Sequence, residues 1–272
     1  MSERLRERFR TRDRQRPLFI PYVTAAYPAP SDTVDILLAM EAGGADVIEI
    51  GVPFSDPLAD GATIQHANEV ALAQGASFAL CLEFVRDARE RGLQAPVLFM
   101  GYYNPLLAYG EERAVRDARE AGADGFIVVD LPPDEAGTFL AACRDHDMSF
   151  VPLVSPTTSE ARIAGIAATA DAFLYCVSVT GTTGARAELP PGLGEFIERV
   201  RKHTDLPLAI GFGISTREHV EQAGRLADAV VVGSAIISTI DAADGNRRAQ
   251  GVREYVERVT GRRDTGGGDG PA

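Results

Sequence analysis

Two carboxylates lie close together in a stretch whose other residues are mainly apolar or turn-forming. Residues 47–61 read VIEIGVPFSDPLADG: a short apolar run carries Glu49, and a loop flanked by prolines delivers Asp60. Burying a lone carboxylate costs free energy or forces it to take up a proton, so a glutamate inside an apolar strand needs a compensating role. Acid–base chemistry is one such role. The other is a structural carboxylate paired with a backbone donor or a cation.

Three tyrosines and one further carboxylate fall where neighbouring strands are expected to end. They are Tyr22, Tyr102, Tyr175 and Asp130, and all four could face the same opening as the two carboxylates. A single tyrosine at such a position usually serves packing. Several around two carboxylates indicate the walls of a pocket that accepts an aromatic ligand.

Three glycine-bearing loops complete the predicted ring around this opening. They read TGTTG at 180–184, GFGIS at 211–215 and GSAI at 233–236. Glycines let backbone N–H groups approach an oxyanion closely, and a helix N-terminus favours negative charge. The last two loops contain no lysine or arginine, so backbone N–H groups and Ser234 would bind a phosphate there. Turn glycines that bind no ligand are the alternative.

The rest of the sequence narrows the chemistry. The single lysine, Lys202, lies away from any predicted strand end, which disfavours Schiff-base catalysis. The four histidines show no ligand spacing, so we expect no metal. Carboxylate acid–base catalysis on a phosphorylated substrate remains, and we expect it to need no cofactor.

Eight short apolar runs are the elements that must position these residues. They lie at 18–23, 47–50, 97–100, 125–129, 150–154, 172–176, 206–210 and 229–232, with amphipathic helical patterns between them. Strands joined by helical crossovers pair in parallel, and eight of them at this length predict a closed α/β fold, the (β/α)8 TIM barrel. Its sites lie at the carboxyl ends of the strands. A doubly wound open sheet is the alternative, but the glycine-rich dinucleotide turn is missing after the first strand.

The two ends of the chain differ from the barrel in composition. Arginines crowd the first seventeen residues, where Leu5 and Phe9 lie four apart, which predicts an extra amphipathic helix with a solvated basic face. Residues 265–272, TGGGDGPA, predict a disordered tail. We therefore expect one barrel domain over 1–264.

Charge and cysteine content restrict the partners and the compartment. A net charge of −12 argues against nucleic acid and anionic membranes as partners. No apolar run is long enough to span a bilayer, and the N-terminus lacks a signal peptide's apolar region. Cys81, Cys143 and Cys176 show no metal-like spacing, which fits a reducing compartment and predicts a cytoplasmic protein.

Five motifs together resemble the α subunit of tryptophan synthase. They are the stretch at 47–61, GYYNP at 101–105 and the three glycine-bearing loops, and the similarity runs in register from about residue 18 to about residue 259. The resemblance implies a lyase that cleaves indole-3-glycerol phosphate to indole and glyceraldehyde 3-phosphate without a cofactor. It also implies a β subunit, in an α2β2 tetramer, that takes the indole and makes L-tryptophan.

The resemblance also assigns roles to individual residues. Glu49 matches a general acid–base that protonates indole C3 and relays the side-chain hydroxyl proton. Asp60 matches the carboxylate that holds the indole N–H and stabilises positive charge on the ring. Pro53 and Asp56 match the loop that meets the β subunit. We expect substrate contacts from Tyr22, Tyr102, Tyr175, Thr183, Gly184, Phe212, Gly213, Gly233 and Ser234.

Three other functions remain open on the sequence alone. The first is a stand-alone lyase with the same chemistry that makes free indole. The second is a non-catalytic barrel that binds a partner, which has no need of an ionisable group in a buried strand. The third is a phosphosugar isomerase, whose substrate is smaller than the predicted aromatic-lined pocket.

Overall fold

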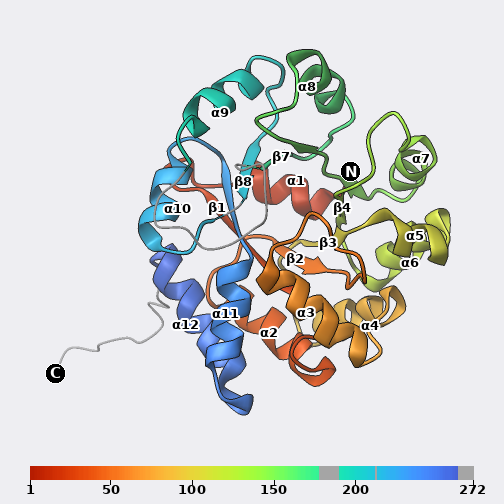
Figure 1. The fold of residues 1–272 in the computed structure, drawn as a ribbon, viewed down its shortest axis with the longest axis vertical. Helices are drawn as coiled ribbons and strands as arrows, with labels where there is room; N and C mark the ends of the chain where they lie inside the picture. The colour runs from red at the N-terminus through yellow and green to blue at the C-terminus, as the bar shows by residue number, and fades with distance from the viewer. Residues whose placement is uncertain (178–189, 212, 263–272) are drawn as a thin grey trace.

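Short parallel strands form the centre of the fold, and helices surround them (Figure 1). The computed structural model describes residues 1–177, 190–211 and 213–262. Within these ranges the strands are hydrogen-bonded in the order β5-β4-β3-β2-β1-β9-β8-β7-β6. Their bounds are β1 Leu18–Thr24, β2 Ile48–Gly51, β3 Val97–Gly101, β4 Gly125–Val128, β5 Ser149–Phe150, β6 Leu153–Val154, β7 Leu174–Val177, β8 Leu208–Gly211 and β9 Ala229–Val232.

The strand predicted at 150–154 is divided into β5 and β6. Pro152 lies between them, and because proline has no N–H it cannot donate to a neighbouring strand. The backbone nevertheless bridges both neighbours: Val151 N–H donates to Phe126 O at 2.9 Å, and Tyr175 N–H donates to Pro152 O at 3.1 Å. Together, β5 and β6 therefore act as the fifth strand of the barrel and close the ring. The predicted TIM barrel is confirmed, and the open sheet is wrong.

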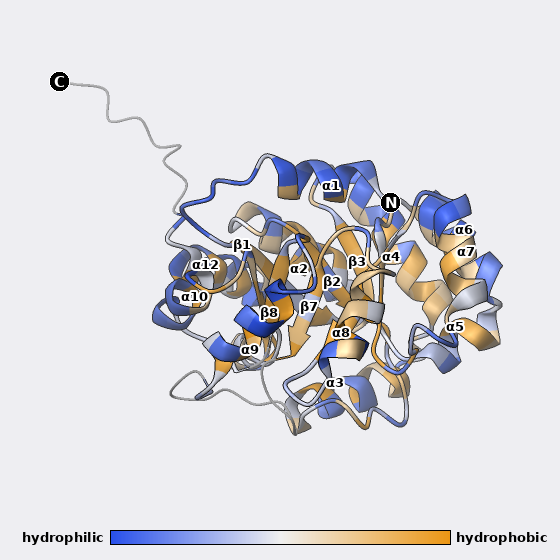
Figure 2. Ribbon diagram, turned by 90° about the horizontal axis from the view of Figure 1, so that it is seen from above, coloured by the Kyte–Doolittle hydropathy of each residue, from blue (hydrophilic) through white to orange (hydrophobic). Residues whose placement is uncertain are grey.

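The helices turn an apolar side toward the strands and a polar side outward (Figure 2). Side-chain caps from Ser77, Ser159 and Thr216 begin three of them. No helix in the described ranges is both long and apolar enough to cross a membrane. The bounds are α1 Glu3–Arg10, α2 Pro30–Ala42, α3 Ala62–Ala73, α4 Phe78–Glu90, α5 Tyr103–Tyr109, α6 Glu111–Ala121, α7 Gly137–Asp145, α8 Glu160–Ala167, α9 Leu193–Arg201, α10 Arg217–Gly224, α11 Ser234–Ala242 and α12 Arg248–Thr260, with a 3-10 turn at Gly245–Arg247.

Strand residues alternate between the barrel interior and the layer under the helices. On β2, Ile48 and Ile50 pack in the helix-facing core, whereas Val47 belongs to the interior cluster. Glu49 lies two residues after Val47 and so faces the interior. The other interior strand residues are Leu18, Ile20, Leu98, Ile127, Val151, Phe173, Tyr175, Ala209, Ala229 and Val231.

Helix α1 closes one end of the barrel. Its Leu5 and Phe9 are buried in the interior cluster, and the Phe9 ring stacks on Phe173 with centroids 5.0 Å apart. Figure 2 shows α1 and α3 at opposite ends of the strands. The predicted N-terminal helix is confirmed, and α1 seals the end remote from α3.

Three arginines spaced four residues apart form ion pairs at this end of the barrel, each with an aspartate that precedes a strand. The pairs are Arg4–Asp124 at 2.9 Å, Arg8–Asp46 at 3.1 Å and Arg12–Asp228 at 2.5 Å. Each aspartate also accepts a backbone N–H from the neighbouring strand: Phe19 donates to Asp46, Val97 to Asp124 and Leu208 to Asp228. The basic face was predicted to be solvated, but it is only partly so, because these arginines bind carboxylates at the barrel's end.

We expect Asp124→Ala to lower the free energy of unfolding by about 3–5 kcal/mol, because it leaves the largely buried Arg89 guanidinium without its carboxylate. Asp35→Ala is the matched control. Asp35 pairs with Arg91 at 2.6 Å in solvent, so its loss should cost about 1 kcal/mol or less. Chemical denaturation followed by circular dichroism measures both. An equal loss of unfolding free energy in the two variants would show that the buried ion pairs stabilise the fold no more than an exposed pair does.

Candidate active site

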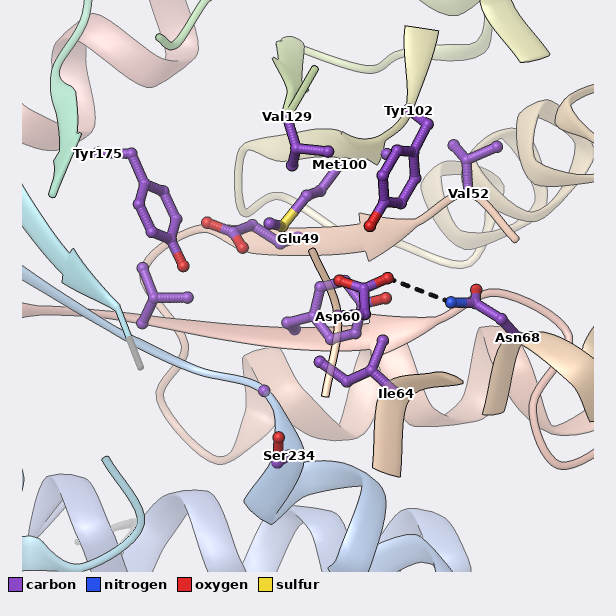
Figure 3. Close-up of a pocket in the computed structure, with 14 residues that line it drawn as sticks. Glu49, Val52, Asp60, Ile64, Asn68, Met100, Tyr102, Val129, Tyr175 and Ser234 are labelled. Carbon is purple, nitrogen blue, oxygen red and sulfur yellow. Dashed lines mark hydrogen bonds between the residues drawn. The ribbon is translucent and has the colours of Figure 1, made fainter. Parts of the chain in front are cut away.

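A pocket opens at the carboxyl ends of the strands, and Figure 3 shows the side chains that line it. The pocket encloses about 610 Å³ of space, its open mouth included. Most of its wall is apolar or aromatic. The lining residues are Tyr22, Glu49, Val52, Asp60, Ile64, Asn68, Met100, Gly101, Tyr102, Val129, Tyr175, Val231, Gly233 and Ser234.

Much of the wall is the last layer of the barrel interior. Tyr22, Glu49 and Tyr175 each continue the inward-facing alternation of their strands. The same rule brings in Val129 and excludes Asp130. Asp130 is exposed and accepts a hydrogen bond from Tyr103 N–H at 2.7 Å, at the start of α5. The expectation that Asp130 faces the same opening as the carboxylates is wrong, because its position in the alternation points it away.

Glu49 is completely buried, with 0% of its surface exposed. Neither carboxyl oxygen has a hydrogen-bond partner among the described residues. Burial raises the pKa of Glu49 well above its ordinary value. In the described part of the chain, the paired structural role that the sequence left open has no support. Burial therefore favours the protonated form of this carboxyl group, which lines the pocket.

Asp60 shares the pocket with Glu49 but has a different environment. Its carboxylate accepts a hydrogen bond from Asn68 Nδ2 at 3.3 Å. Burial raises the pKa of Asp60 to about 6, and hydrogen bonding from Asn68 and Tyr102 limits that rise. Because its pKa stays below neutrality, Asp60 is mainly ionised at pH 7, whereas burial shifts Glu49 toward its protonated form.

Several contacts hold the loop that carries Asp60. Tyr102 Oη accepts a hydrogen bond from Ala59 N–H at 2.8 Å, and the Phe54 ring packs on the Tyr102 ring with centroids 5.0 Å apart. Gln65 Nε2 donates to the Asp60 backbone oxygen at 2.9 Å. These contacts anchor the loop on both sides of the carboxylate.

Tyr22 and Tyr175 lie over glycines at the ends of neighbouring strands. A Cβ atom on Gly51 would lie 2.0 Å from the Tyr22 hydroxyl, and one on Gly211 would lie 2.1 Å from the Tyr175 hydroxyl. Only glycine leaves room for the two rings at these positions. Burial raises the pKa of both phenols, so they stay neutral.

The predicted phosphate loops are brought into the pocket only in part. Gly233 and Ser234 line it, at the N-terminal end of α11. Gly213 has a positive φ of 75° after β8 and does not line this pocket. Thr183, Gly184 and Phe212 lie outside the described residues.

The structure adds Asn68, which the sequence reading missed. It lies on the buried side of α3, one turn after Ile64 and between Ala67 and Ala71 in the same apolar stripe. A polar residue on an apolar stripe, about two helical turns after a candidate catalytic loop, is the signal that could have found it.

The loop at 53–58 lies beside the pocket. Pro53 is buried and shapes the loop, whereas Asp56 is exposed and accepts a hydrogen bond from Ser55 Oγ. Leu58 is 90% exposed, which is unusual for a large apolar side chain. Asp56 and Leu58 therefore both lie on the solvent side of this loop.

Comparison with known proteins gives one consistent family. Residues 9–263 match the family model described as tryptophan synthase alpha chain. A tryptophan synthase alpha chain from Roseiflexus sp. (strain RS-1) is 50% identical over 90% of this chain and 94% of the relative. A tryptophan synthase structure from Mycobacterium tuberculosis superposes with a TM-score of 0.88, at 33% identity over 96% of this chain and 98% of that one. A tryptophan synthase complex from Pyrococcus furiosus gives 0.82 at 34% identity, covering 89% and 97%. The chain belongs to the tryptophan synthase alpha chain family.

Proposed function

We propose that this chain is a lyase that cleaves indole-3-glycerol phosphate to indole and glyceraldehyde 3-phosphate, for L-tryptophan synthesis. The observation that carries the proposal is the pair of carboxyl groups in one pocket. Glu49 is buried, has no hydrogen-bond partner among the described residues and is shifted toward its protonated form, while Asp60 is hydrogen-bonded and mainly ionised at pH 7. Two carboxyl groups held in different protonation states divide the roles of acid and anion.

The cleavage requires a net proton transfer that Glu49 can supply. Glu49 donates a proton to indole C3, which interrupts the aromaticity of the five-membered ring. The bond between C3 and the glycerol chain then breaks, and its electrons return to the ring. The chain's hydroxyl group loses its proton to Glu49 and becomes the aldehyde of glyceraldehyde 3-phosphate. Glu49 ends in its starting state, so the reaction consumes no cofactor.

Asp60 stabilises the charge that this step creates. Protonation at C3 leaves positive charge spread onto the indole nitrogen. An ionised carboxylate that accepts the indole N–H opposes that charge, and it does so more strongly in a buried pocket than in water. Asp60 meets this need because it is ionised at neutral pH.

The remaining wall fits the substrate's two halves. Tyr22, Tyr102 and Tyr175 offer flat surfaces for the indole ring. Gly233 and Ser234, at the start of α11, offer backbone N–H groups and a hydroxyl to the phosphate. From the sequence we also expect substrate contacts from Thr183, Gly184, Phe212 and Gly213.

The partner is a tryptophan synthase β subunit, which receives the indole. A related chain at 34% identity occurs in a solved tryptophan synthase complex. The sequence predicts Pro53 and Asp56 as partner contacts; Asp56 is exposed on the loop that carries Leu58, whereas Pro53 is buried. Docking on this loop would act on Asp60, which follows in the same segment.

We expect Glu49→Gln to lower indole formation by about 10²- to 10⁴-fold, the range for loss of a general acid–base. The fold should remain, because a neutral amide is easier to bury than a carboxylate. Thermal unfolding at pH 8 should therefore give a midpoint no lower than that of the wild type. A folded Glu49→Gln enzyme that makes indole at near wild-type rate would contradict the proposed role.

We expect kcat/KM for indole formation to fall on both sides of neutrality. Acid protonates Asp60, whose pKa is about 6, so activity should decline as the pH drops through that value. Base removes the proton from Glu49, whose pKa is raised by burial, so activity should decline again at higher pH. Asp60→Asn should lose most of the activity, and the activity that remains should no longer decline on the acid side of the pH profile, which we call its acid limb. Rates that stay flat from pH 5 to pH 9 would contradict the assignment.

We expect indole formation by the isolated chain to be slow and to rise with added β subunit until the two are equimolar. The reason is that the loop of residues 53–60 joins the partner surface to Asp60. A titration of β subunit into the indole assay measures this. Full turnover by the chain alone, unchanged by the partner, would instead support a stand-alone lyase.

A further inference from the structure

Asn68 is a buried polar side chain of the pocket to which the reaction above gives no role. It is 3% exposed, and it lies on the apolar stripe of α3. An asparagine in such a stripe weakens packing unless both ends of its amide are used. One end is used: Nδ2 donates to Asp60 Oδ2 at 3.3 Å (Figure 3).

We propose that Asn68 is a positioning residue that fixes the orientation and the charge of the Asp60 carboxylate toward the substrate. The inference rests on the function proposed above. Asn68 reaches the reacting centre through Asp60, since α3 begins just after the Asp60-Gly61 turn. One amide arm therefore links the helix, which is rigid, to a carboxylate that sits on a loop.

The groups around Asp60 make this amide important. Glu49 faces it from β2, and the phenols of Tyr22, Tyr102 and Tyr175 face it from β1, from the segment after β3 and from β7. Within the described residues no cation lowers the pKa of Asp60. Hydrogen-bond donors are therefore what opposes its desolvation, and the Asn68 amide is the larger of the two side-chain contributions.

The other end of the amide has no use in the described part of the chain. Asn68 Oδ1 is buried and has no hydrogen-bond partner among the described residues. Because Asn68 lines the pocket, a hydroxyl or N–H of the bound substrate can supply the missing donor. The amide would then be fully used only when substrate is present.

Two variants remove the donor without adding a group that can share a proton with Asp60, Asn68→Leu and Asn68→Ala. In the full chain with its β subunit, each should move the acid limb of kcat/KM upward by about one pH unit. The reason is that Asp60 without its donor takes up a proton more readily. At pH 7 each should lower kcat by about ten- to a hundredfold, with a smaller change in KM.

Gln65→Leu is the matched control on the same helix. Gln65 donates to the backbone oxygen of Asp60 and not to its carboxylate, so its loss loosens the loop and leaves the acid limb in place. The proposal is supported if the acid limb of the pH profile shifts to higher pH in both Asn68 variants and keeps its position in the control. A limb that stays in the Asn68 variants, or moves equally in the control, overturns it. Failure of both Asn68 variants to fold would assign the residue to packing and would also overturn it.

A second measurement separates this inference from the proposed function. If the wild type makes no indole, the proposed function fails. The Asp60 carboxyl can still be titrated by carbon-13 NMR in the ligand-free chain, before and after Asn68→Leu. A higher midpoint in the variant supports the role of Asn68, and an equal midpoint overturns it.

Discussion

The cost of burying one unpaired carboxyl group is the constraint on which this structure depends. Glu49 has no exposed surface, and its oxygens have no partner in the described part of the chain. Burial favours the protonated form, and a protonated group beside a cavity can give its proton to a ligand. Water must be kept from it on every other side. A closed ring of strands, plugged at the far end by α1, provides that enclosure.

Two carboxyl groups near β2, within four residues of each other, have opposite environments. Asp46, before the strand, accepts a backbone N–H from Phe19 and binds the guanidinium groups of Arg8 and Arg262. Glu49, inside the strand, has none of these partners. Ion pairs thus gather at the end of the barrel that holds it together, and the lone acid lies at the end that opens. The barrel separates the residues that stabilise it from the residues that react.

Short apolar runs separated by amphipathic stretches made the strands predictable from the sequence. The carboxylate inside one such run indicated Glu49, and the loops after the last strands follow from their glycines. Asp130 was misplaced because a one-residue error at a strand end reverses the side a residue faces. Asn68 was missed because its role depends on α3 folding back beside the loop it follows. The partners of Arg4, Arg8 and Arg12 lie far away in the sequence, which local patterns cannot reveal.

The glycines beneath Tyr22 and Tyr175 limit how the pocket can change. Because the Tyr22 and Tyr175 rings lie against Gly51 and Gly211, these two phenols form the floor of the cavity. Any larger residue at either glycine would lift a ring into the space of the ligand. Room for a substituted indole must therefore come from the side walls, at Ile64, Met100 or Val129, where a shorter side chain leaves both rings seated. The side-wall residues, and not the two tyrosines at the floor, therefore determine which substituted indoles this pocket can hold.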